Sequence, residues 1–372
     1  MKRISILLLI LFTFLASAAW PQAPTQWRHH KIITFDVPGA GTGANQGTIP
    51  YGINAWGAII GWYTDDSNVN HGFLRTPGGK IMTFDAPQAG TGSGQGTNPY
   101  GMNNEGVIVG TTTDAGGAYH GFLRALDGEI RTLDVPGAGT AAGQGTWTTN
   151  INDEGTISGG YIDGTFLIHE YLILRDGDYV IFEVPGAGTG ALQGTDGPTF
   201  YGLNAAGTVT GWYIDENYLY HGYVHTRDGK LTTFDDPKAA TGPNQGTWPF
   251  SINAEGEVAG VYYDASNISH GFLRSPHGKM TTYDAPGAVG GTFIASNNAA
   301  GAITGSYWDA SGNAHSFEYM PGGKFVGFDA PGAVYGTYSS GNNAAGEVMG
   351  NYVDAKGANH GFLRRADNEH ER

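Results

Sequence analysis

The chain has 372 residues, of which 62 are glycine and none is cysteine, and its formal net charge is −15 at pH 7. This acidic balance disfavours nucleic acid as a partner, because a negatively charged surface repels phosphate backbones. Only 14% of the residues are charged and 12% are aromatic. Such a composition is typical of many short aromatic strands joined by tight turns, so we expect an all-β fold.

The first residues have the pattern of a secretory signal. Lys2 and Arg3 precede an apolar run over residues 4–15, and small residues follow at 16–18. We therefore predict a signal peptide over residues 1–18, a short leader over 19–26, and export to the periplasm or the medium. The apolar run is too short to span a bilayer as a helix, so no membrane anchor is expected. Because there is no cysteine, the exported protein must be held together by packing alone.

From residue 27 to residue 364 the chain repeats itself seven times. Each repeat carries a histidine with an aspartate six positions before it, and successive histidines are 49 residues apart at His71 and His120 and 45 apart at His315 and His360. Periods of this length are typical of propellers and solenoids. The pairs are Asp65 and His71, Asp114 and His120, Asp163 and His169, Asp215 and His221, Asp264 and His270, Asp309 and His315, and Asp354 and His360.

Four strands are predicted in each repeat. In the first repeat, the first strand ends in the turn "INAWG". The second, third and fourth strands contain "AIIGWYTD", "HGFLR" and "KIMTFDAP", in that order. An asparagine three residues before a glycine predicts a tight turn after the first strand. A glycine inside the second strand predicts that an aromatic side chain of the third strand lies over the backbone there.

The two ends of the repeated region complement each other. The region begins with a lone fourth strand around residues 32–35 and finishes with a lone third strand over 360–364, before a charged tail at 365–372. We therefore predict a seven-bladed β-propeller with four strands per blade, in which the N-terminal strand completes the last blade and leaves no open edge. An open solenoid is the alternative, but it would need atypical capping repeats.

Several segments resemble a known repeat. The strand "HGFLR", the turns "INDEG" and "NNEG", and the segment "TFDVPGAGT" resemble the HAF-type extracellular repeats of secreted bacterial proteins. The resemblance covers residues 27–364 and implies an extracellular repeat protein, without implying a catalytic motif. The third and sixth repeats depart from the pattern, since they have "HEYLI" and "HSFEY" in place of "HGFLR".

The Asp and His of each pair lie at the two ends of the predicted hairpin between the second and third strands. Seven identical pairs are typical of a structural device, in which the Asp binds loop amides and the His is held across the hairpin. Metal ligation and pH sensing are the alternatives. A zinc site needs four converging donors, which this spacing does not indicate, whereas an exposed histidine titrates near pH 6.5. We therefore predict no metal site and no cofactor.

The repetition breaks in the links between repeats and at a few aromatic positions. The first five links contain "QGT", the last two are shorter, and the fourth gains three residues around 196–198. We expect the links and the Asp–His hairpins to share one face of the ring, where binding commonly occurs. Aromatic side chains there could stack on sugar rings or anchor a protein partner, and packing between blades is the alternative for each of them. The candidate ligand-binding residues are Trp62, Trp147, Trp212, Tyr218, Tyr220 and Trp248.

The sequence contains no recognisable catalytic motif. It lacks a cysteine nucleophile, a G-x-S-x-G elbow, a phosphate-binding loop and an H-E-x-x-H helix, so we assign no catalytic residue. The leading prediction is a secreted, non-enzymatic propeller that binds a carbohydrate or a protein on its loop-bearing face. One alternative is a polysaccharide-active glycoside hydrolase or lyase that uses irregular residues such as Glu170, Glu318 or His225. Another is a passive structural or surface protein.

Overall fold

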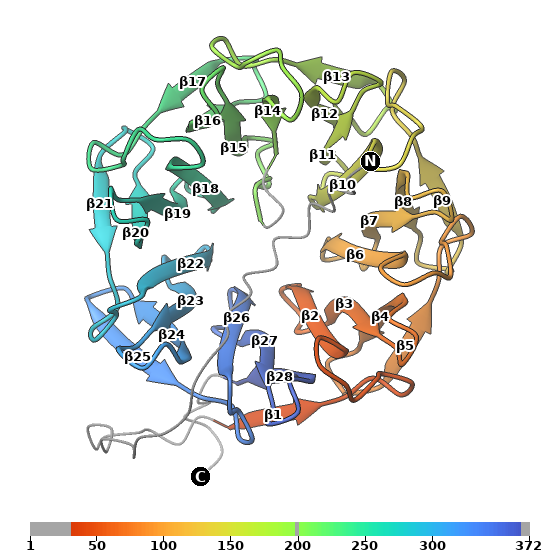
Figure 1. Ribbon diagram of the computed structural model, residues 1–372, viewed down its shortest axis with the longest axis vertical. Coiled ribbons are helices and arrows are strands. Elements are labelled where there is room, and N and C mark those ends of the chain that lie inside the picture. The colour runs from red at the N-terminus through yellow and green to blue at the C-terminus, as the bar shows by residue number, and fades with distance from the viewer. Residues whose placement is uncertain (1–30, 198–200, 366–372) are drawn as a thin grey trace.

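The computed structural model describes residues 31–197 and 201–365, and these residues form an all-β ring (Figure 1). The described residues contain no helix, and 28 strands join in one sheet that runs around a central axis. The predicted all-β class is therefore confirmed. None of the described residues forms an apolar helix long enough to cross a membrane. The predicted signal peptide and leader, and the tail from residue 366, lie outside the described residues.

The strands are short and follow one another at regular intervals. They are β1 (Ile32–Phe35), β2 (Gly47–Ile53), β3 (Ile59–Thr64), β4 (Asn70–Arg75), β5 (Ile81–Phe84), β6 (Gly96–Met102), β7 (Ile108–Thr113), β8 (Tyr119–Arg124), β9 (Ile130–Leu133), β10 (Gly145–Ile151), β11 (Ile157–Ile162), β12 (Ile168–Ile173), β13 (Tyr179–Phe182), β14 (Gly194–Asp196), β15 (Val209–Ile214), β16 (Tyr220–His225), β17 (Leu231–Phe234), β18 (Gly246–Ile252), β19 (Val258–Tyr263), β20 (Ser269–Arg274), β21 (Met280–Tyr283), β22 (Gly291–Asn297), β23 (Ile303–Trp308), β24 (Ala314–Met320), β25 (Lys324–Phe328), β26 (Gly336–Asn342), β27 (Val348–Val353) and β28 (Asn359–Arg364).

Consecutive strands pair antiparallel from the centre of the ring outward. β2 lies nearest the central axis and pairs with β3, β3 pairs with β4, and β4 pairs with β5 (Figure 1). The chain then returns to the centre with β6, which touches β4 through one parallel bridge between Asn70 and Gly96. The same order begins again with β6, β7, β8 and β9.

A glycine in the second strand of the second repeat shows why the strands pack so closely. A Cβ on Gly110 would lie 2.3 Å from the carbonyl oxygen of Asn98 and 2.7 Å from the ring of Phe122. Real Cβ atoms do not approach other atoms so closely, so only glycine fits between the inner strand and this ring. The predicted packing of a third-strand aromatic over the glycine is therefore confirmed, and Phe122 is fully buried.

The asparagines of the tight turns form a closed circuit of hydrogen bonds on one face of the ring. The Oδ1 of Asn103 accepts the backbone N–H groups of its own turn, and its Nδ2 donates to the carbonyl oxygen of Asn152 in the next repeat. Asn343 donates to the carbonyl oxygen of Asn54 at 3.1 Å and completes the circuit. The full circuit, in the order of donation, is Asn54, Asn103, Asn152, Asn204, Asn253, Asn298 and Asn343. All of these side chains are buried, so the circuit ties each repeat to the next.

The first and last strands of the described chain also pair with each other. β1 pairs antiparallel with β28, with Ile32 opposite Arg364 and Phe35 opposite Gly361. β28 in turn forms a parallel bridge to β2 through Asn359 and Gly47. These pairings remove the free edges that an open row of repeats would expose, and they agree with a ring rather than a solenoid.

A side chain of the fourth repeat reaches across the centre of the ring. The hydroxyl of Tyr201 donates to the carbonyl oxygen of Tyr51 and accepts the N–H of Ile53, both at 3.3 Å. The N–H of Ile252 donates to the carbonyl oxygen of Tyr201 at 2.9 Å. A small cavity beside Tyr201 is lined by residues that include Met102. Tyr201 therefore connects inner strands that lie far apart in the sequence.

Candidate functional site

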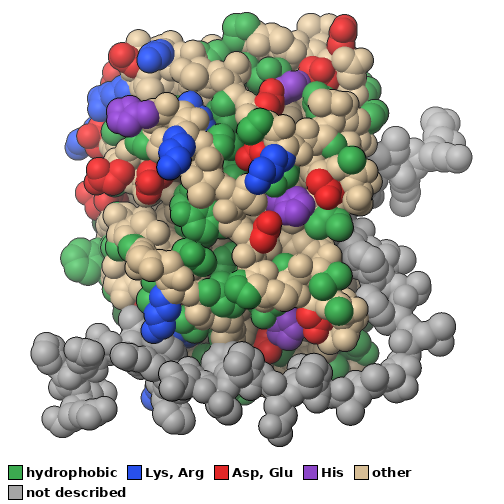
Figure 2. All heavy atoms as spheres, turned by 90° about the vertical axis from the view of Figure 1, so that its left-hand side faces the viewer, with side chains coloured by type: hydrophobic (Ala, Val, Ile, Leu, Met, Phe, Trp, Pro, Cys, Tyr) green, Lys and Arg blue, Asp and Glu red, His purple; other side chains and the backbone are tan. Residues whose placement is uncertain are grey.

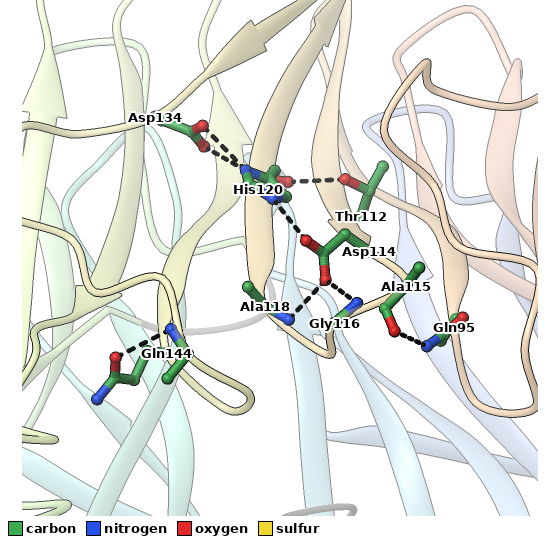
Figure 3. A network of polar contacts seen from close by, with 10 residues as sticks. Gln95, Thr112, Asp114, Ala115, Gly116, Ala118, His120, Asp134 and Gln144 are labelled. Carbon is green, nitrogen blue, oxygen red and sulfur yellow. Dashed lines mark hydrogen bonds and ion pairs between the residues drawn. The ribbon is translucent and has the colours of Figure 1, made fainter.

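The Asp–His hairpins and the links between repeats meet on one face, at the end of the strands opposite the asparagine circuit. The start of β2, at Gly47, lies beside Thr64, which precedes the hairpin of its own repeat. The link glutamines hold the hairpins. The Nε2 of Gln46 donates to the Oδ1 of Asn68 at 3.1 Å, and the Nε2 of Gln95 donates to the carbonyl oxygen of Ala115 at 3.2 Å (Figure 3). We call this surface the loop-bearing face.

Each repeated histidine lies between two carboxylates. In the second repeat, the Oδ1 of Asp114 accepts the N–H groups of Gly116 and Ala118, while its Oδ2 lies 3.4 Å from the Nε2 of His120 (Figure 3). The Nδ1 of His120 lies 2.9 Å from the Oδ2 of Asp134 at the end of the fourth strand. We call this arrangement an imidazole clamp. Histidine side chains beside acidic side chains recur along the outer wall (Figure 2).

Sequence reasoning missed the second carboxylate of every clamp. The signal was present, because an acidic residue follows the histidine by 14 positions in six repeats, and Asp36 serves His360 across the ring closure. The second carboxylates belong to Asp36, Asp85, Asp134, Glu183, Asp235, Asp284 and Asp329. In most repeats the imidazole also stacks on a tyrosine, as His169 does on Tyr161 at a centroid distance of 4.5 Å.

In four of the clamps, the electrostatics favour the protonated imidazole. The hydrogen bond to Glu183 raises the pKa of His169 and outweighs burial, which alone would lower it. Burial alone would raise the pKa of Asp114, but hydrogen bonds from Ala118 N–H, His120 and Gly116 N–H lower it. Both nitrogens of each imidazole are thus engaged by carboxylates of the same repeat or its neighbour, which leaves no ring nitrogen directed at an external ligand.

The structure separates the six candidate aromatic residues into different environments. Trp62 is half-buried and packs against Tyr51 and Tyr100, at centroid distances of 5.3 and 5.8 Å, between the first two repeats. Trp147 is also half-buried and lies over Gly160, where a Cβ would be 2.4 Å from its ring. These two tryptophans fill space between strands.

Three further candidates form one stacked group between the fourth and fifth repeats. Trp248 stacks on Tyr220 at a centroid distance of 4.1 Å and on Trp212 at 5.8 Å. Trp212 is only 6% exposed and belongs to a core cluster that also contains Phe250. This group is largely a packing element, although Trp248 Nε1 is buried without a partner among the described residues.

Tyr218 is the one candidate that stands out on the surface. Its side chain is 42% exposed at the tip of the fourth hairpin, and its hydroxyl donates to the carbonyl oxygen of Ala191 in the adjacent link at 3.2 Å. On the other side of that link, the N–H of Leu192 donates to the carbonyl oxygen of Phe166, which is 38% exposed at the tip of the third hairpin. Phe166, Leu192 and Tyr218 thus lie on adjacent loops of the loop-bearing face, and we call these three residues the loop patch.

The sequence prediction missed Phe166 and Leu192. The signal that could have found them is positional, because Phe166 aligns with Asn68 and Leu192 aligns with Asn45. Leu192 is partly buried against a core cluster that contains Ile168, so packing accounts for it in part, whereas Phe166 remains 38% exposed.

The irregular acidic residues of the enzyme alternative lie in different interfaces. Glu318 is 3% exposed, and its Oε2 lies 2.8 Å from the Nη1 of Arg364, which is 1% exposed. Glu170 is fully buried, and neither of its carboxyl oxygens has a hydrogen-bond partner within the described ranges. Burial therefore raises the pKa of Glu170 well above its usual value. His225, the third irregular residue, packs on Phe182 at a centroid distance of 4.1 Å.

Glu170 adjoins a second acidic side chain and an unpaired phenol. A Cβ on Gly197 would lie 2.3 Å from the Oε2 of Glu170, so the carboxyl group fills the space that a side chain would need there. Burial raises the pKa of the neighbouring Asp196 to about 7, against hydrogen bonds from the Trp212 side chain and Gly197 N–H. The Tyr223 hydroxyl is buried without a partner among the described residues. Because Glu170 has no exposed surface, it cannot contact a polysaccharide in this conformation.

No metal centre is formed by the residues that the structure describes. Within 31–197 and 201–365, no three His, Asp or Glu side chains are grouped so that they could hold a metal ion.

Comparisons with known proteins give the fold. No family model matches the chain, and no curated protein matches it. Among solved structures, it is similar to virginiamycin B lyase from Staphylococcus aureus, with a TM-score of 0.56 and 14% identity over 91% of this chain and 100% of that one. It is similar to the BP39L lectin from Burkholderia pseudomallei, with a TM-score of 0.55 and 8% identity over 86% of this chain and 94% of that one. A puromycin hydrolase variant matches with a TM-score of 0.52 and 14% identity over 82% of this chain and 50% of that one.

These likenesses concern the fold alone. The matched proteins include two enzymes and a lectin, and identities of 8–14% carry no activity from one chain to another. Together with the ring of strands, they establish a β-propeller fold, as the sequence predicted.

Proposed function

We propose that this protein is an exported, seven-bladed β-propeller that binds a carbohydrate or a protein on its loop-bearing face and has no catalytic role. The blade number is supported by the antiparallel order of strands, which starts again at β2, β6, β10, β14, β18, β22 and β26. The asparagine circuit has the same number of members. Four strands per blade and closure of the last blade by β1 agree with the pairing of β26, β27, β28 and β1.

The observation that carries the binding proposal is the exposure of Phe166 and Tyr218 on neighbouring hairpins. Both side chains contribute little to the core, and both lie on the face where the repeats differ most in their loops. Loops positioned by a rigid scaffold are common binding sites, and exposed aromatic side chains are common contacts for sugars and proteins. The signal-like N-terminus and the resemblance to HAF-type repeats support export and an extracellular partner.

Affinity electrophoresis through gels that contain single polysaccharides tests this proposal. We expect at least one polymer to retard the purified mature protein. The double variant Phe166→Ala, Tyr218→Ala should raise the Kd at least about tenfold, because central aromatic contacts typically contribute more than 1 kcal/mol each. If no polymer retards the protein, the protein-ligand branch of the proposal has to be tested with candidate partners.

The matched control is Trp56→Ala. Trp56 is 70% exposed, but it lies in an asparagine turn on the opposite face, where its Nε1 donates to the carbonyl oxygen of Asn104. This variant should bind as the wild type does. Equal loss of binding in the control and in the double variant would contradict a site on the loop-bearing face.

A further inference from the structure

The residues of the loop patch share an unusual backbone conformation. In the described chain, the non-glycine residues with positive φ are Asn45, Asn68, Phe166, Leu192, Tyr218, Asn244 and Asn267. They occupy only two kinds of position, the tip of the Asp–His hairpin and the residue before the link glutamine. Other repeats have glycine with positive φ at these positions, as at Gly117 and Gly94.

Asparagine and glycine suit these positions, whereas bulky side chains do not. The left-handed region is accessible to glycine and is tolerated by asparagine, but it brings the Cβ of a larger residue close to the backbone. Phe166, Leu192 and Tyr218 have φ angles of 67°, 61° and 61°. These three therefore carry backbone strain that asparagine would largely relieve.

The strained residues are gathered in one place. The link that contains Leu192 lies between the third and fourth hairpins and is bonded to both, through Phe166 and Tyr218. The burial of Phe166 and Tyr218 does not compensate for the strain, because more than a third of each side chain is exposed. Leu192 is partly buried against the core, so the strain that packing leaves uncompensated lies at Phe166 and Tyr218. Such strain is a common feature of functional sites.

We propose that the loop patch is a platform for the apolar faces of neutral sugar rings, and that the strain is retained for this contact. The inference rests on the proposed function and names its contact residues and ligand class. Sugar rings present C–H groups on one face, which suit aromatic and aliphatic side chains, and hydroxyls at their rim. Exposed Thr165 and Asn217 flank the patch. Their side chains donate to Asp163 and Asp215, and their oxygens can accept hydrogen bonds from such hydroxyls.

The charge around the patch selects against anionic ligands. The hairpins and the link, residues 161–169, 188–196 and 214–221, contain no lysine or arginine. They do contain carboxylates, including the exposed Glu216. The only basic side chains in these ranges are His169 and His221, and each is paired with two carboxylates. The remaining acidic charge repels uronate, sulfate and phosphate polymers but does not repel a neutral polysaccharide.

The test is a triple variant that restores the residue typical of the other repeats, Phe166→Asn, Leu192→Asn, Tyr218→Asn. Its thermal unfolding midpoint should rise by roughly 2–4 °C, since strain is relieved. Its affinity for a neutral polymer that retards the wild type, from a panel of amylose, β-glucan and galactomannan, should fall at least tenfold. Alginate and pectate should retard neither protein.

The control makes the reverse substitution, from asparagine to an aromatic residue, in another repeat. Asn267 holds the same position in the fifth repeat, with a φ of 60°. The variant Asn267→Tyr should lower the unfolding midpoint and leave binding unchanged.

The outcomes separate this inference from the proposed function. If the triple variant is stabilised but keeps its affinity for the neutral polymer, the platform is elsewhere and the binding function stands. If the triple variant is not stabilised, the strain argument is wrong. If only anionic polymers retard the wild type, or if a protein is bound and no glycan is, the ligand class proposed here is wrong while binding itself remains.

Discussion

Replacing Glu318 with glutamine is expected to lower the free energy of unfolding by about 3 kcal/mol, as is usual when one member of a buried ion pair is removed. Glu318 on β24 and Arg364 on β28 are buried and bonded at 2.8 Å across two neighbouring repeats. The guanidinium of Arg364 also lies 4.9 Å from the ring centroid of Phe328. Without the carboxylate, the charged guanidinium of Arg364 stays buried with no opposite charge beside it. The folded state is therefore destabilised relative to the unfolded state, in which water solvates the guanidinium.

The same substitution at Glu170 is expected to have the opposite sign. Among residues 31–197 and 201–365, Glu170 has no basic partner, and burial raises its pKa above the ordinary value of 4.5. A carboxyl group whose pKa is higher in the folded state costs nothing below its unfolded pKa, and it destabilises increasingly as the pH rises toward the folded pKa. Glutamine removes this cost, so Glu170→Gln should stabilise the protein more at pH 8 than at pH 5.

Urea unfolding of both variants at pH 5 and pH 8 provides the measurement. Each variant serves as the control for the other, because the chemical change is identical and only the surroundings differ. Destabilisation by Glu170→Gln at pH 8 would contradict an uncompensated buried charge at Glu170. A neutral effect of Glu318→Gln would contradict the stabilising role of the Glu318 carboxylate beside Arg364.

Four imidazole clamps are expected to stabilise the ring most between about pH 4 and pH 6.5, because the imidazole and the carboxylates beside it are then charged. The pKa values of His120, His169, His221 and His315 are raised, through hydrogen bonds and charge interactions with their carboxylates. Their contribution is complete below the unfolded pKa of 6.5. It is lost as the pH rises through the higher folded values.

The aspartates set the acidic limit. The pKa of Asp163 is lowered, since hydrogen bonds from Thr165, Leu167 N–H and His169 outweigh burial. The contribution of a carboxylate with a lowered pKa is present above the unfolded value of 3.8 and is lost as the pH falls through the folded value. Individual exposed pairs contribute only about 0.2–1 kcal/mol, but four histidines together give about 2 kcal/mol.

Denaturant unfolding from pH 3 to pH 9 checks this profile. A variant with His120, His169, His221 and His315 changed to glutamine should lose the part of the decline above pH 6.5 that the clamps cause, about 2 kcal/mol. The remaining decline should come from Glu170 and Asp196, whose raised pKa values also favour acidic conditions, and Glu170→Gln and Asp196→Asn should remove it. An unchanged decline in the histidine variant would exclude the clamps as its cause.

The repeat pattern predicted local features of the fold well and contacts between repeats poorly. An asparagine three residues before glycine predicted the tight turn at Asn103, because turn chemistry is local. The hydrogen bond from Asn103 to Asn152 depends on how neighbouring repeats are placed, which no spacing within one repeat encodes. Likewise, the hydrogen bond from Tyr201 to Tyr51 joins residues 150 positions apart. It has no counterpart in the repeat pattern, so the pattern could not predict it.

The candidate site was likewise predicted only in part from the sequence. The pattern predicted that His120 and Asp114 occupy one hairpin, but not that Asp134 engages the other ring nitrogen. The pattern identified tryptophans because they differ between repeats. Trp212 is nevertheless buried, since a side chain that differs between repeats can also fill a gap between strands. Exposure depends on the finished packing, so sequence alone could not separate Tyr218 from the rest.

Hydrogen–deuterium exchange of the purified protein, with and without an oligosaccharide of the polymer that retards it, tests the central claim most directly. Binding at the loop-bearing face predicts slower exchange in the third and fourth hairpins and the link between them, residues 163–168, 190–193 and 215–220. It predicts no change in the asparagine turns of the opposite face, such as residues 54–57. Slower exchange confined to those turns, or to the inner strands around Tyr201, would contradict a ligand site on the loop-bearing face.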